Sequence, residues 1–418
     1  MKNYKYIIIG GGTTAGYAAK EFAEQGIQKG ELCIVSTESI LPMNRPPFSK
    51  GYLRDGKNTE EILIKEKEFY LKNGIDVLLE TTVKAVNFGH KKLDLGDGQV
   101  LGYEKLLIAT GSQLKRLNIE GKDLDNVFYL RSIKQSDNIR EQAAKAQEVV
   151  VVGGGYIGTE TAASLNQMGL DVTLVLPEER LLSKFASADI AAFFQNAFEK
   201  KGVNLVFRES VIKFHGNEKV ESVELTSGKM LETDMVVAGI GVRPNINIFE
   251  NSGLNINKGI VVNEFCETNI ENVYAAGDVV EFPDLIFGKI KIIQHWEHAF
   301  EQGPHAIRVM TGKREPYVFL PFFFSDVFEY SYEFFGDTED ADEVFNRGNL
   351  ETGDFSTWWF KGDRLVAAFI MSSRPEEEGK LAREWITNKR DVDKVKIMDS
   401  GSEMNKLVVN TGLYENEF

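Results

Sequence analysis

The chain has 418 residues, a formal net charge of −15, 43% hydrophobic residues and 27% charged residues. This composition is typical of a folded globular protein, and the length corresponds to roughly two to three domains. The negative charge disfavours binding to nucleic acid or to an anionic membrane surface. We expect no membrane span, because no apolar run approaches about 18 residues. The first apolar strand begins near residue 5, so we also expect neither a signal nor a transit peptide.

The first predicted element is a β-strand that runs directly into a glycine-rich turn. An apolar run at 6–9 precedes Gly10-x-Gly12-x-x-Ala15, and a helix-forming stretch at 17–25 follows it. In this pattern the first glycine makes the tight turn and the second lets the backbone approach a pyrophosphate. The third small residue lets the helix pack closely on the strand, and the phosphates lie at the helix N-terminus. An apolar strand at 32–35 completes the unit.

The same pattern occurs a second time. An apolar strand at 149–152 leads into Gly153-x-Gly155-x-x-Gly158, followed by a helical stretch at 159–168 and a strand at 172–176. A single glycine motif is weak evidence, but two copies in the full strand–loop–helix–strand context predict two dinucleotides in one protein.

The order of the segments predicts one nucleotide-binding domain inserted into another. Segments 106–112 and 235–244 each close a nucleotide-binding half, and 272–278 returns the chain to the first domain. Aromatic residues become dense after Pro321, and two strand-like runs are joined by a turn at 361–363. We therefore predict the α/β class, with two Rossmann-like dinucleotide-binding domains and a C-terminal α+β domain. The tail from about Arg390 has no predicted structure.

The cysteines and histidines exclude two kinds of chemistry. The two cysteines, Cys33 and Cys266, are far apart, so we predict buried structural thiols rather than a redox-active pair. Two cysteines and no targeting segment favour a cytoplasmic, reducing location. His295 and His298 are three residues apart, but no third ligand is near them in the sequence, so we predict no metal site.

The chain resembles the flavoprotein superfamily that includes ferredoxin reductases, apoptosis-inducing factor and monodehydroascorbate reductase, and it is most similar overall to the last. The segments that carry the resemblance are Tyr4–Glu24, Arg45–Tyr52, Tyr129–Arg131, Ala188–Phe193 and Leu320–Ser325. The resemblance implies an FAD-binding domain at 1–117 and 245–318, an NAD-binding domain at 118–244, and a C-terminal domain at 319–418 that covers the flavin.

The resemblance also implies which residues contact FAD. They are Gly10, Gly12 and Ala15 at the pyrophosphate, Glu38 at the adenosine ribose, Arg45 and Arg131 as FAD-contacting arginines, Val83 at adenine, and Asp278 at a ribityl hydroxyl. Asp278 is also expected to start the next helix; its alternative role is that of a helix N-cap only. Lys50 and Glu160 are implied to form a catalytic ion pair beside flavin N5, and the alternative is two unrelated surface charges.

A second group of residues is implied for the nicotinamide cofactor. They are Gly153, Gly155, Gly158 and Gly241 of the second nucleotide unit, Tyr156, Glu178, and the segment Gln294-His295-Trp296 at the nicotinamide and pyrimidine edge. Tyr156 would cover the flavin ring or, alternatively, pack in the core. Glu178 would accept from the ribose hydroxyls and repel a 2′-phosphate, which favours NADH. NADPH stays possible, because Arg180 and Lys184 could accommodate that phosphate.

The resemblance breaks at the electron acceptor. Plant monodehydroascorbate reductases have an arginine and a tyrosine where this chain has Asp326 and Trp358. We expect an acceptor rim formed by Trp296, Phe324, Asp326 and Trp358. The expected activity is hydride transfer from NADH to FAD and then one-electron transfer to a small molecule or small redox protein of the monodehydroascorbate, ferredoxin or quinone type. The alternative is an NADH-responsive interaction protein with slow turnover, like apoptosis-inducing factor.

Overall fold

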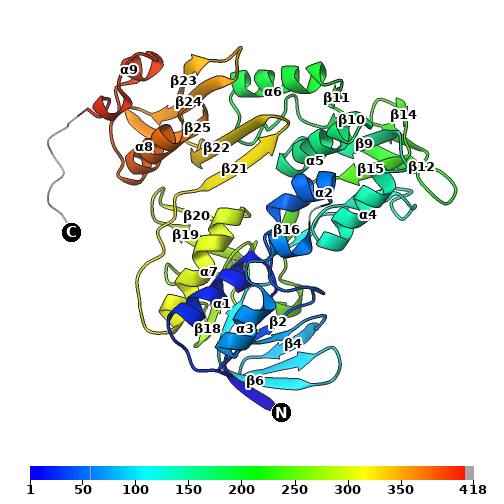
Figure 1. Cartoon of the computed structure of the whole chain (residues 1–418). Helices are drawn as coiled ribbons and strands as arrows, with labels where there is room; N and C mark the ends of the chain where they lie inside the picture. The colour runs from blue at the N-terminus through cyan, green and yellow to red at the C-terminus, as the bar shows by residue number, and fades with distance from the viewer. Residues whose placement is uncertain (57, 410–418) are drawn as a thin grey trace. The chain divides into compact units, whose positions relative to one another are not determined.

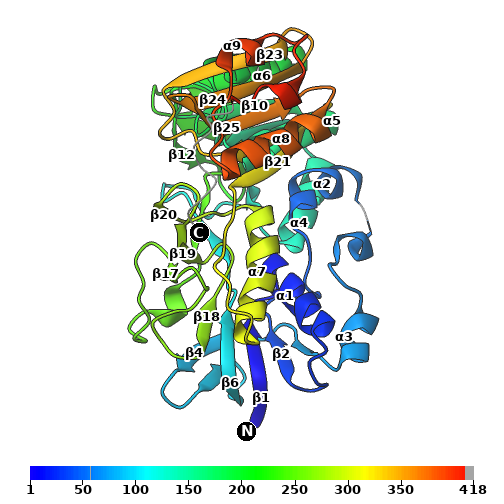
Figure 2. The ribbon, with the colours of Figure 1, turned by 90° about the vertical axis from the view of Figure 1, so that its left-hand side faces the viewer.

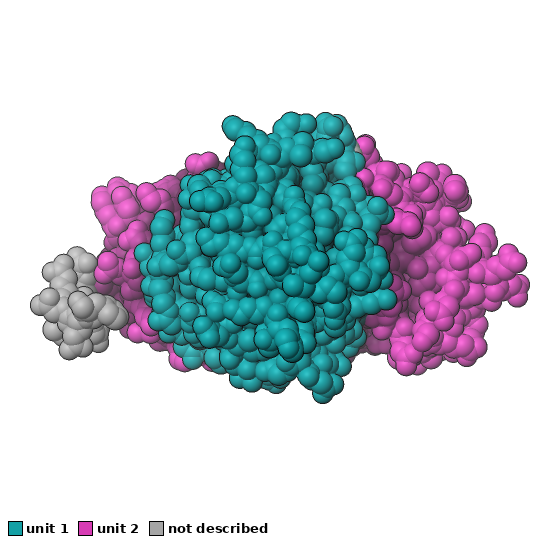
Figure 3. Space-filling model, turned by 90° about the horizontal axis from the view of Figure 1, so that it is seen from below, with its two compact units in different colours: residues 1–47, 57–115, 242–319 teal, residues 48–56, 116–241, 320–418 magenta. Residues whose placement is uncertain are grey.

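The computed structural model describes residues 1–56 and 58–409, and Figure 1 follows them along the chain. They form two compact units, coloured separately in Figure 3. Unit 1 comprises residues 1–47, 57–115 and 242–319; unit 2 comprises 48–56, 116–241 and the chain from Leu320 onward. Within the described ranges, no helix combines the length and apolar character that a membrane crossing requires.

Unit 1 is built on a seven-stranded sheet in the order β3-β2-β1-β6-β5-β4, with β18 also paired to β6. Its strands are β1 (Lys2–Ile9), β2 (Leu32–Val35), β3 (Asp76–Leu78), β4 (Val83–Asn87), β5 (Lys92–Leu95), β6 (Val100–Ile108) and β18 (Val273–Ala275). β1 pairs in parallel with both β2 and β6, whereas β5 is antiparallel to both of its neighbours. The centre of the sheet is apolar on both faces, as parallel strands covered on two sides require.

The helices of unit 1 cover this sheet. α1 (Thr13–Glu24) and α7 (Trp296–Met310) lie side by side, as Figures 1 and 2 show. Small residues of α1 and Phe22 pack with β1 and the end of α7 in one apolar cluster. The other elements are α3 (Lys67–Asn73), β7 (Ser112–Leu114) paired with β16 (Val242–Pro244), and the sheet of β17 (Ile260–Val261), β19 (Val280–Asp284) and β20 (Lys289–Lys291).

The first half of unit 2 repeats the parallel arrangement. Its five-stranded sheet has the order β11-β10-β9-β15-β8, with strands β8 (Val127–Tyr129), β9 (Glu148–Val152), β10 (Asp171–Leu176), β11 (Asn204–Phe207) and β15 (Met235–Ala238). A separate antiparallel sheet contains β12 (Val211–His215), β13 (Ser222–Leu225) and β14 (Met230–Glu232). The helices are α2 (Gly51–Asp55), α4 (Ile133–Ala143), α5 (Tyr156–Gln167) and α6 (Ala188–Lys200). Ser132 and Gln135 form a capping box that fixes the start of α4.

The C-terminal part of unit 2 is an antiparallel sheet in the order β21-β22-β25-β24-β23. Its strands are β21 (Phe322–Val327), β22 (Tyr330–Gly336), β23 (Glu343–Asn349), β24 (Asp354–Lys361) and β25 (Arg364–Met371), so the predicted turn between the last two is confirmed. α8 (Pro375–Thr387) packs on β22 and β25, while Phe193 and Phe194 of α6 contact aromatic rings of the sheet. The tail that the sequence left without structure contains α9 (Lys394–Met398).

The two compact units divide the chain differently from the three predicted domains, because unit 2 contains most of the predicted NAD-binding domain, the described part of the predicted C-terminal domain and residues 48–56. Residues 48–56 were expected in the FAD-binding domain, but they belong to unit 2. The reason is a set of long-range hydrogen bonds to α4 and α5. The Ser136 hydroxyl donates to the Phe48 carbonyl (2.9 Å), and the Ser164 hydroxyl donates to the Ser49 carbonyl (2.7 Å). Lys50 therefore lies in the same unit as Glu160.

Candidate functional site

The first glycine loop, between β1 and α1, has the geometry of a phosphate cradle. Gly10 has φ +134°, and a Cβ there would lie 2.1 Å from the Ala109 carbonyl oxygen, so only glycine fits. Gly12 precedes the first turn of α1, which has neither a side-chain cap nor an acidic residue. The amide groups of that turn therefore have no competing side-chain acceptor and suit a phosphate. Ala15 is fully buried, as close packing of the helix requires.

The second loop, between β9 and α5, repeats this geometry. Gly153 has φ +111°, and a Cβ on Gly158 would lie 1.8 Å from the Gly153 carbonyl oxygen. A Cβ on Gly155 would meet no atom within 4 Å, so the space in front of this residue is open. The first turn of α5 also lacks a side-chain cap and acidic residues. Both loops fit the pyrophosphate of a dinucleotide.

Two of the implied FAD ligands lie beside the first loop. Glu38 and Arg45 form an ion pair of 2.6 Å, and each side chain is about one-fifth exposed (22% and 20%). A Cβ on Gly12 would lie 3.7 Å from the Arg45 guanidinium. A carboxylate acceptor and a guanidinium donor therefore flank the cradle, which suits ribose hydroxyls and phosphate oxygens.

Asp278 is next to this region of unit 1 but does not start a helix. The Ser112 hydroxyl donates to its carboxylate at 2.7 Å. Asp278 follows Gly277 in a turn, and the next element is strand β19. The expectation that it starts or caps a helix is wrong, because the chain turns directly into the β17–β19–β20 sheet. Its predicted contact with a ribityl hydroxyl stays a prediction.

The segment before α7 has a donor without a protein acceptor. His295 is the N-cap residue of α7 and makes no side-chain capping bond, and the Trp296 indole donates to the Asn44 side chain at 2.9 Å. The Gln294 amide nitrogen is buried and has no hydrogen-bond partner. A buried amide donor of this kind is costly unless a bound group accepts from it. This observation fits a flavin or nicotinamide edge with carbonyl acceptors.

Lys50 and Glu160 form a buried ion pair in unit 2. The Lys50 Nζ lies 3.2 Å from Glu160 Oε1 and 3.4 Å from Asp326 Oδ2, and it sits over the Phe324 ring at 5.1 Å. The side chains of Lys50 and Glu160 are only 14% and 7% exposed, whereas that of Asp326 is 49% exposed. One ammonium is therefore shared by two carboxylates, which leaves the cluster with a net negative formal charge.

Sequence reasoning missed two serines that hold Glu160 in place. The Ser49 hydroxyl donates to Glu160 Oε2 and the Ser325 hydroxyl donates to Oε1. With Lys50, both carboxylate oxygens have donors, so the side chain is fixed in one orientation. The only local signal was that each serine immediately precedes a residue of the cluster, Lys50 or Asp326.

The expectation that Trp358 forms part of an acceptor rim is wrong. Its side chain has no exposed surface, its ring lies 6.0 Å from that of Trp385 in α8, and its indole donates to Ser356. Helices α6 and α8 pack on the two faces of the C-terminal sheet. A side chain at the centre of β24 is therefore buried on either face. Phe324, by contrast, is 38% exposed and lies beside Asp326 on β21.

The remaining predicted ligands have the following positions. Tyr156 is half-buried and packs against Phe185 and Phe323, which supports the core alternative for part of its ring. Glu178 is exposed, two residues beyond the end of β10. The others are Val83 at the start of β4, Arg131 just before α4, and Gly241 with φ +97° before β16.

The cysteines and histidines have no redox or metal-binding arrangement. Cys33 and Cys266 are free and buried, and burial raises the pKa of the Cys33 thiol to about 12. His298 stacks on Phe282, and burial lowers its pKa to about 3. Over residues 1–56 and 58–409, no group of three or more potential ligands could hold a metal ion.

Two glycine loops, each leading into a helix without a side-chain cap, define a protein that binds two dinucleotides. The comparisons with known proteins agree. Residues 4–303 match the pyridine nucleotide-disulphide oxidoreductase family, and residues 320–404 match the monodehydroascorbate reductase 3-like C-terminal domain. The chain belongs to the pyridine nucleotide-disulphide oxidoreductase family, and it is an enzyme of the NAD(P)H-dependent FAD flavoprotein reductase type.

The similar proteins include plant monodehydroascorbate reductases and solved structures of ferredoxin reductases. Monodehydroascorbate reductase of Solanum lycopersicum is 35% identical over 91% of this chain and 94% of that protein, and the peroxisomal monodehydroascorbate reductase 1 of Arabidopsis thaliana is 37% identical over 91% and 94%. A Rhodopseudomonas palustris ferredoxin reductase structure has a TM-score of 0.92 at 26% identity, covering 96% of this chain and 99% of that one. The covalent putidaredoxin reductase–putidaredoxin complex has a TM-score of 0.91 at 29% identity, covering 97% of each chain.

Proposed function

We propose that this enzyme oxidises NADH and passes electrons singly to a neutral small oxidant, such as a quinone, or to an iron–sulfur protein. Bound FAD would supply the two-electron to one-electron conversion. The single observation that carries the acceptor class is the Asp326 carboxylate. It lies 3.4 Å from Lys50 and is half exposed beside the exposed ring of Phe324.

The charge of this cluster argues against an anionic radical as the preferred acceptor. Lys50 is balanced by Glu160, which is buried and hydrogen-bonded by two serines, so Asp326 leaves an excess negative charge at the exposed end. A second anion about 4 Å from Asp326 would be repelled by about 1 kcal/mol in water and by more where solvent is excluded. A neutral acceptor avoids this repulsion and still contacts the Phe324 ring.

NADH is proposed over NADPH because of Glu178. This exposed carboxylate lies two residues beyond Leu176, the last residue of β10. The end of β10 packs against the second glycine loop, because a Cβ on Gly154 would lie 2.4 Å from the Leu176 side chain. A carboxylate at this point accepts from ribose hydroxyls and repels a 2′-phosphate.

The acceptor proposal is tested by comparing Asp326→Arg with the native chain. Reduction of the monodehydroascorbate radical should rise in the variant relative to reduction of neutral benzoquinone, because an anion is replaced by a bidentate donor. Glu329→Arg is the matched control, since this exposed residue of the β21–β22 turn pairs with Lys201 and not with Lys50. Native activity on the radical equal to that on quinone, with no gain from the arginine, would refute the proposed acceptor class.

The same assays separate the enzyme from the interaction-protein alternative. Rapid steady-state cycling with any of these acceptors supports the proposal. Slow turnover with all of them, accompanied by NADH-dependent dimerisation, would support a signalling role like that of apoptosis-inducing factor.

A further inference from the structure

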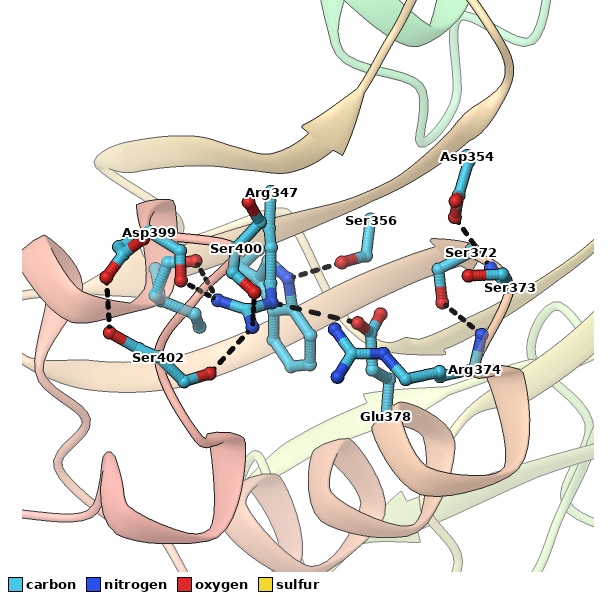
Figure 4. A network of polar contacts seen from close by, with 12 residues as sticks. Arg347, Asp354, Ser356, Ser372, Ser373, Arg374, Glu378, Asp399, Ser400 and Ser402 are labelled. Carbon is cyan, nitrogen blue, oxygen red and sulfur yellow. Dashed lines mark hydrogen bonds and ion pairs between the residues drawn. The ribbon is translucent and has the colours of Figure 1, made fainter.

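A polar cavity of about 310 Å³ lies within the C-terminal part of unit 2 (Figure 4). It has no residue in common with the Lys50–Glu160–Asp326 cluster. Its lining residues come from β23, the start of β24, the turn before α8, the first turn of α8 and the loop after α9: Arg347, Gly348, Asn349, Asp354, Ser372, Ser373, Arg374, Glu378 and Ser400. Because a water molecule occupies about 30 Å³ in the liquid, the volume corresponds to about ten water molecules.

The floor of this cavity contains a buried arginine and a buried glutamate. Arg347 and Glu378 are each 2% exposed. The two terminal nitrogens of Arg347 donate to the backbone carbonyl of Ile397 in α9 and to those of Asp399, Ser400 and Ser402 in the loop after α9. The guanidinium therefore holds that loop in place as one wall of the cavity, as Figure 4 shows.

Two polar atoms of the floor have no hydrogen-bond partner. They are the Arg347 Nε, which is a donor, and the Glu378 Oε2, which is an acceptor. The Arg347 Nε lies 3.8 Å from Glu378 Oε1, which is too long for a hydrogen bond. Burial raises the pKa of Glu378 above its usual range, although the nearby hydroxyl groups of Ser356 and Ser372, and then the charges of Arg347 and Arg374, oppose this effect. A hydroxyl group satisfies both atoms at once, because it accepts from Nε–H and donates to a carboxylate oxygen.

The mouth of the cavity has donors for an anion. Arg374 and Ser373 are exposed there, and the backbone of Arg374 donates to the Ser372 hydroxyl at 3.3 Å. A guanidinium and a hydroxyl suit a carboxylate. The acidic residues Asp354 and Glu378 also line the cavity, and the first turn of α8 has two further glutamates, Glu376 and Glu377. Together they disfavour a ligand with several negative charges, such as a pyrophosphate.

We propose that this cavity binds a small hydroxylated carboxylate. Its carboxylate lies at Arg374 and Ser373, and one of its hydroxyl groups bridges the Arg347 Nε and the Glu378 Oε2. The cavity volume limits the ligand to about ten non-hydrogen atoms or somewhat more. The site is independent of the proposed electron acceptor.

Calorimetric titration of the full chain with its flavin bound tests this proposal, with D-gluconate as the probe. Acetate lacks the hydroxyl groups and sorbitol lacks the carboxylate, so both should bind at least about tenfold more weakly than gluconate. Arg374→Gln should weaken gluconate binding by about tenfold or more. The matched control is Lys380→Gln, which removes the same charge from an exposed position of α8 that does not line the cavity.

Three results would overturn the proposal. They are the absence of gluconate binding at millimolar concentration, binding that is equal in the native chain and in Arg374→Gln, and acetate or sorbitol binding as tightly as gluconate. Ser373→Ala provides a second variant at an exposed position. An unchanged gluconate affinity in both Ser373→Ala and Arg374→Gln would place the probe elsewhere.

Discussion

Two glycine-to-alanine substitutions in the second glycine loop should have different effects, one on NADH affinity and the other on the free energy of unfolding. Gly155 has an extended backbone, with φ −84° and ψ −173°, and its added Cβ meets nothing within 4 Å. Gly155→Ala should therefore change the free energy of unfolding by no more than about 0.5 kcal/mol. The new methyl group would occupy the space that a pyrophosphate must enter. Loss of one charge-assisted bond of about 1.5–3 kcal/mol should weaken NADH binding by about tenfold or more.

Gly158→Ala should behave in the opposite way. Its Cβ would lie 1.8 Å from the Gly153 carbonyl oxygen, so α5 or the loop must move. Overpacking of this kind costs about 1–3 kcal/mol. Over most of this range, the cost exceeds the gain of about 1 kcal/mol in helix propensity from glycine to alanine. Urea unfolding and NADH titration of both variants are the assays. A Gly155→Ala protein with native NADH affinity would refute the assignment of this loop to the pyrophosphate.

Three further predictions follow from single side chains. Glu178→Ala should lower NADH affinity by about tenfold and change NADPH affinity less. Glu179 pairs with Arg208, and the control variant Glu179→Ala should leave the ratio of the KM values for NADH and NADPH unchanged. Burial lowers the pKa of His298 to about 3, so this side chain is neutral in the folded state and stability is lost as pH falls below about 6.5. His298→Phe should reduce the loss between about pH 6.5 and pH 5 by about 1.6 kcal/mol in urea unfolding, and an unchanged pH dependence would contradict the burial argument. Trp358→Phe should lower the free energy of unfolding by about 1–3 kcal/mol through loss of the Ser356 bond and of volume, and any specific change in acceptor kinetics would restore Trp358 to the rim.

The features that could be predicted from the amino-acid sequence are those with a local physical cause. Both cradles follow from neighbouring residues, because a positive φ at Gly10 and Gly153 and a small residue three positions after Gly12 and Gly155 are requirements of one turn and one helix. The turn at 361–363 was predicted for the same reason. The pairing of Lys50 with Glu160 was available only through resemblance, since 110 positions separate them (160 − 50).

Packing between distant segments determines which side chains contact each other and which are buried. Alternation along β24 predicts that neighbouring side chains face opposite sides of the sheet, but helices cover both sides, so Trp358 is buried. Lys50 lies 3.4 Å from Asp326 because residues 48–56 pack on α4 and α5. The chain after Asp278 forms strand β19 because β17 and β20 pair with it on either side. In each case the deciding contact comes from a segment far along the chain, and no local pattern encodes it.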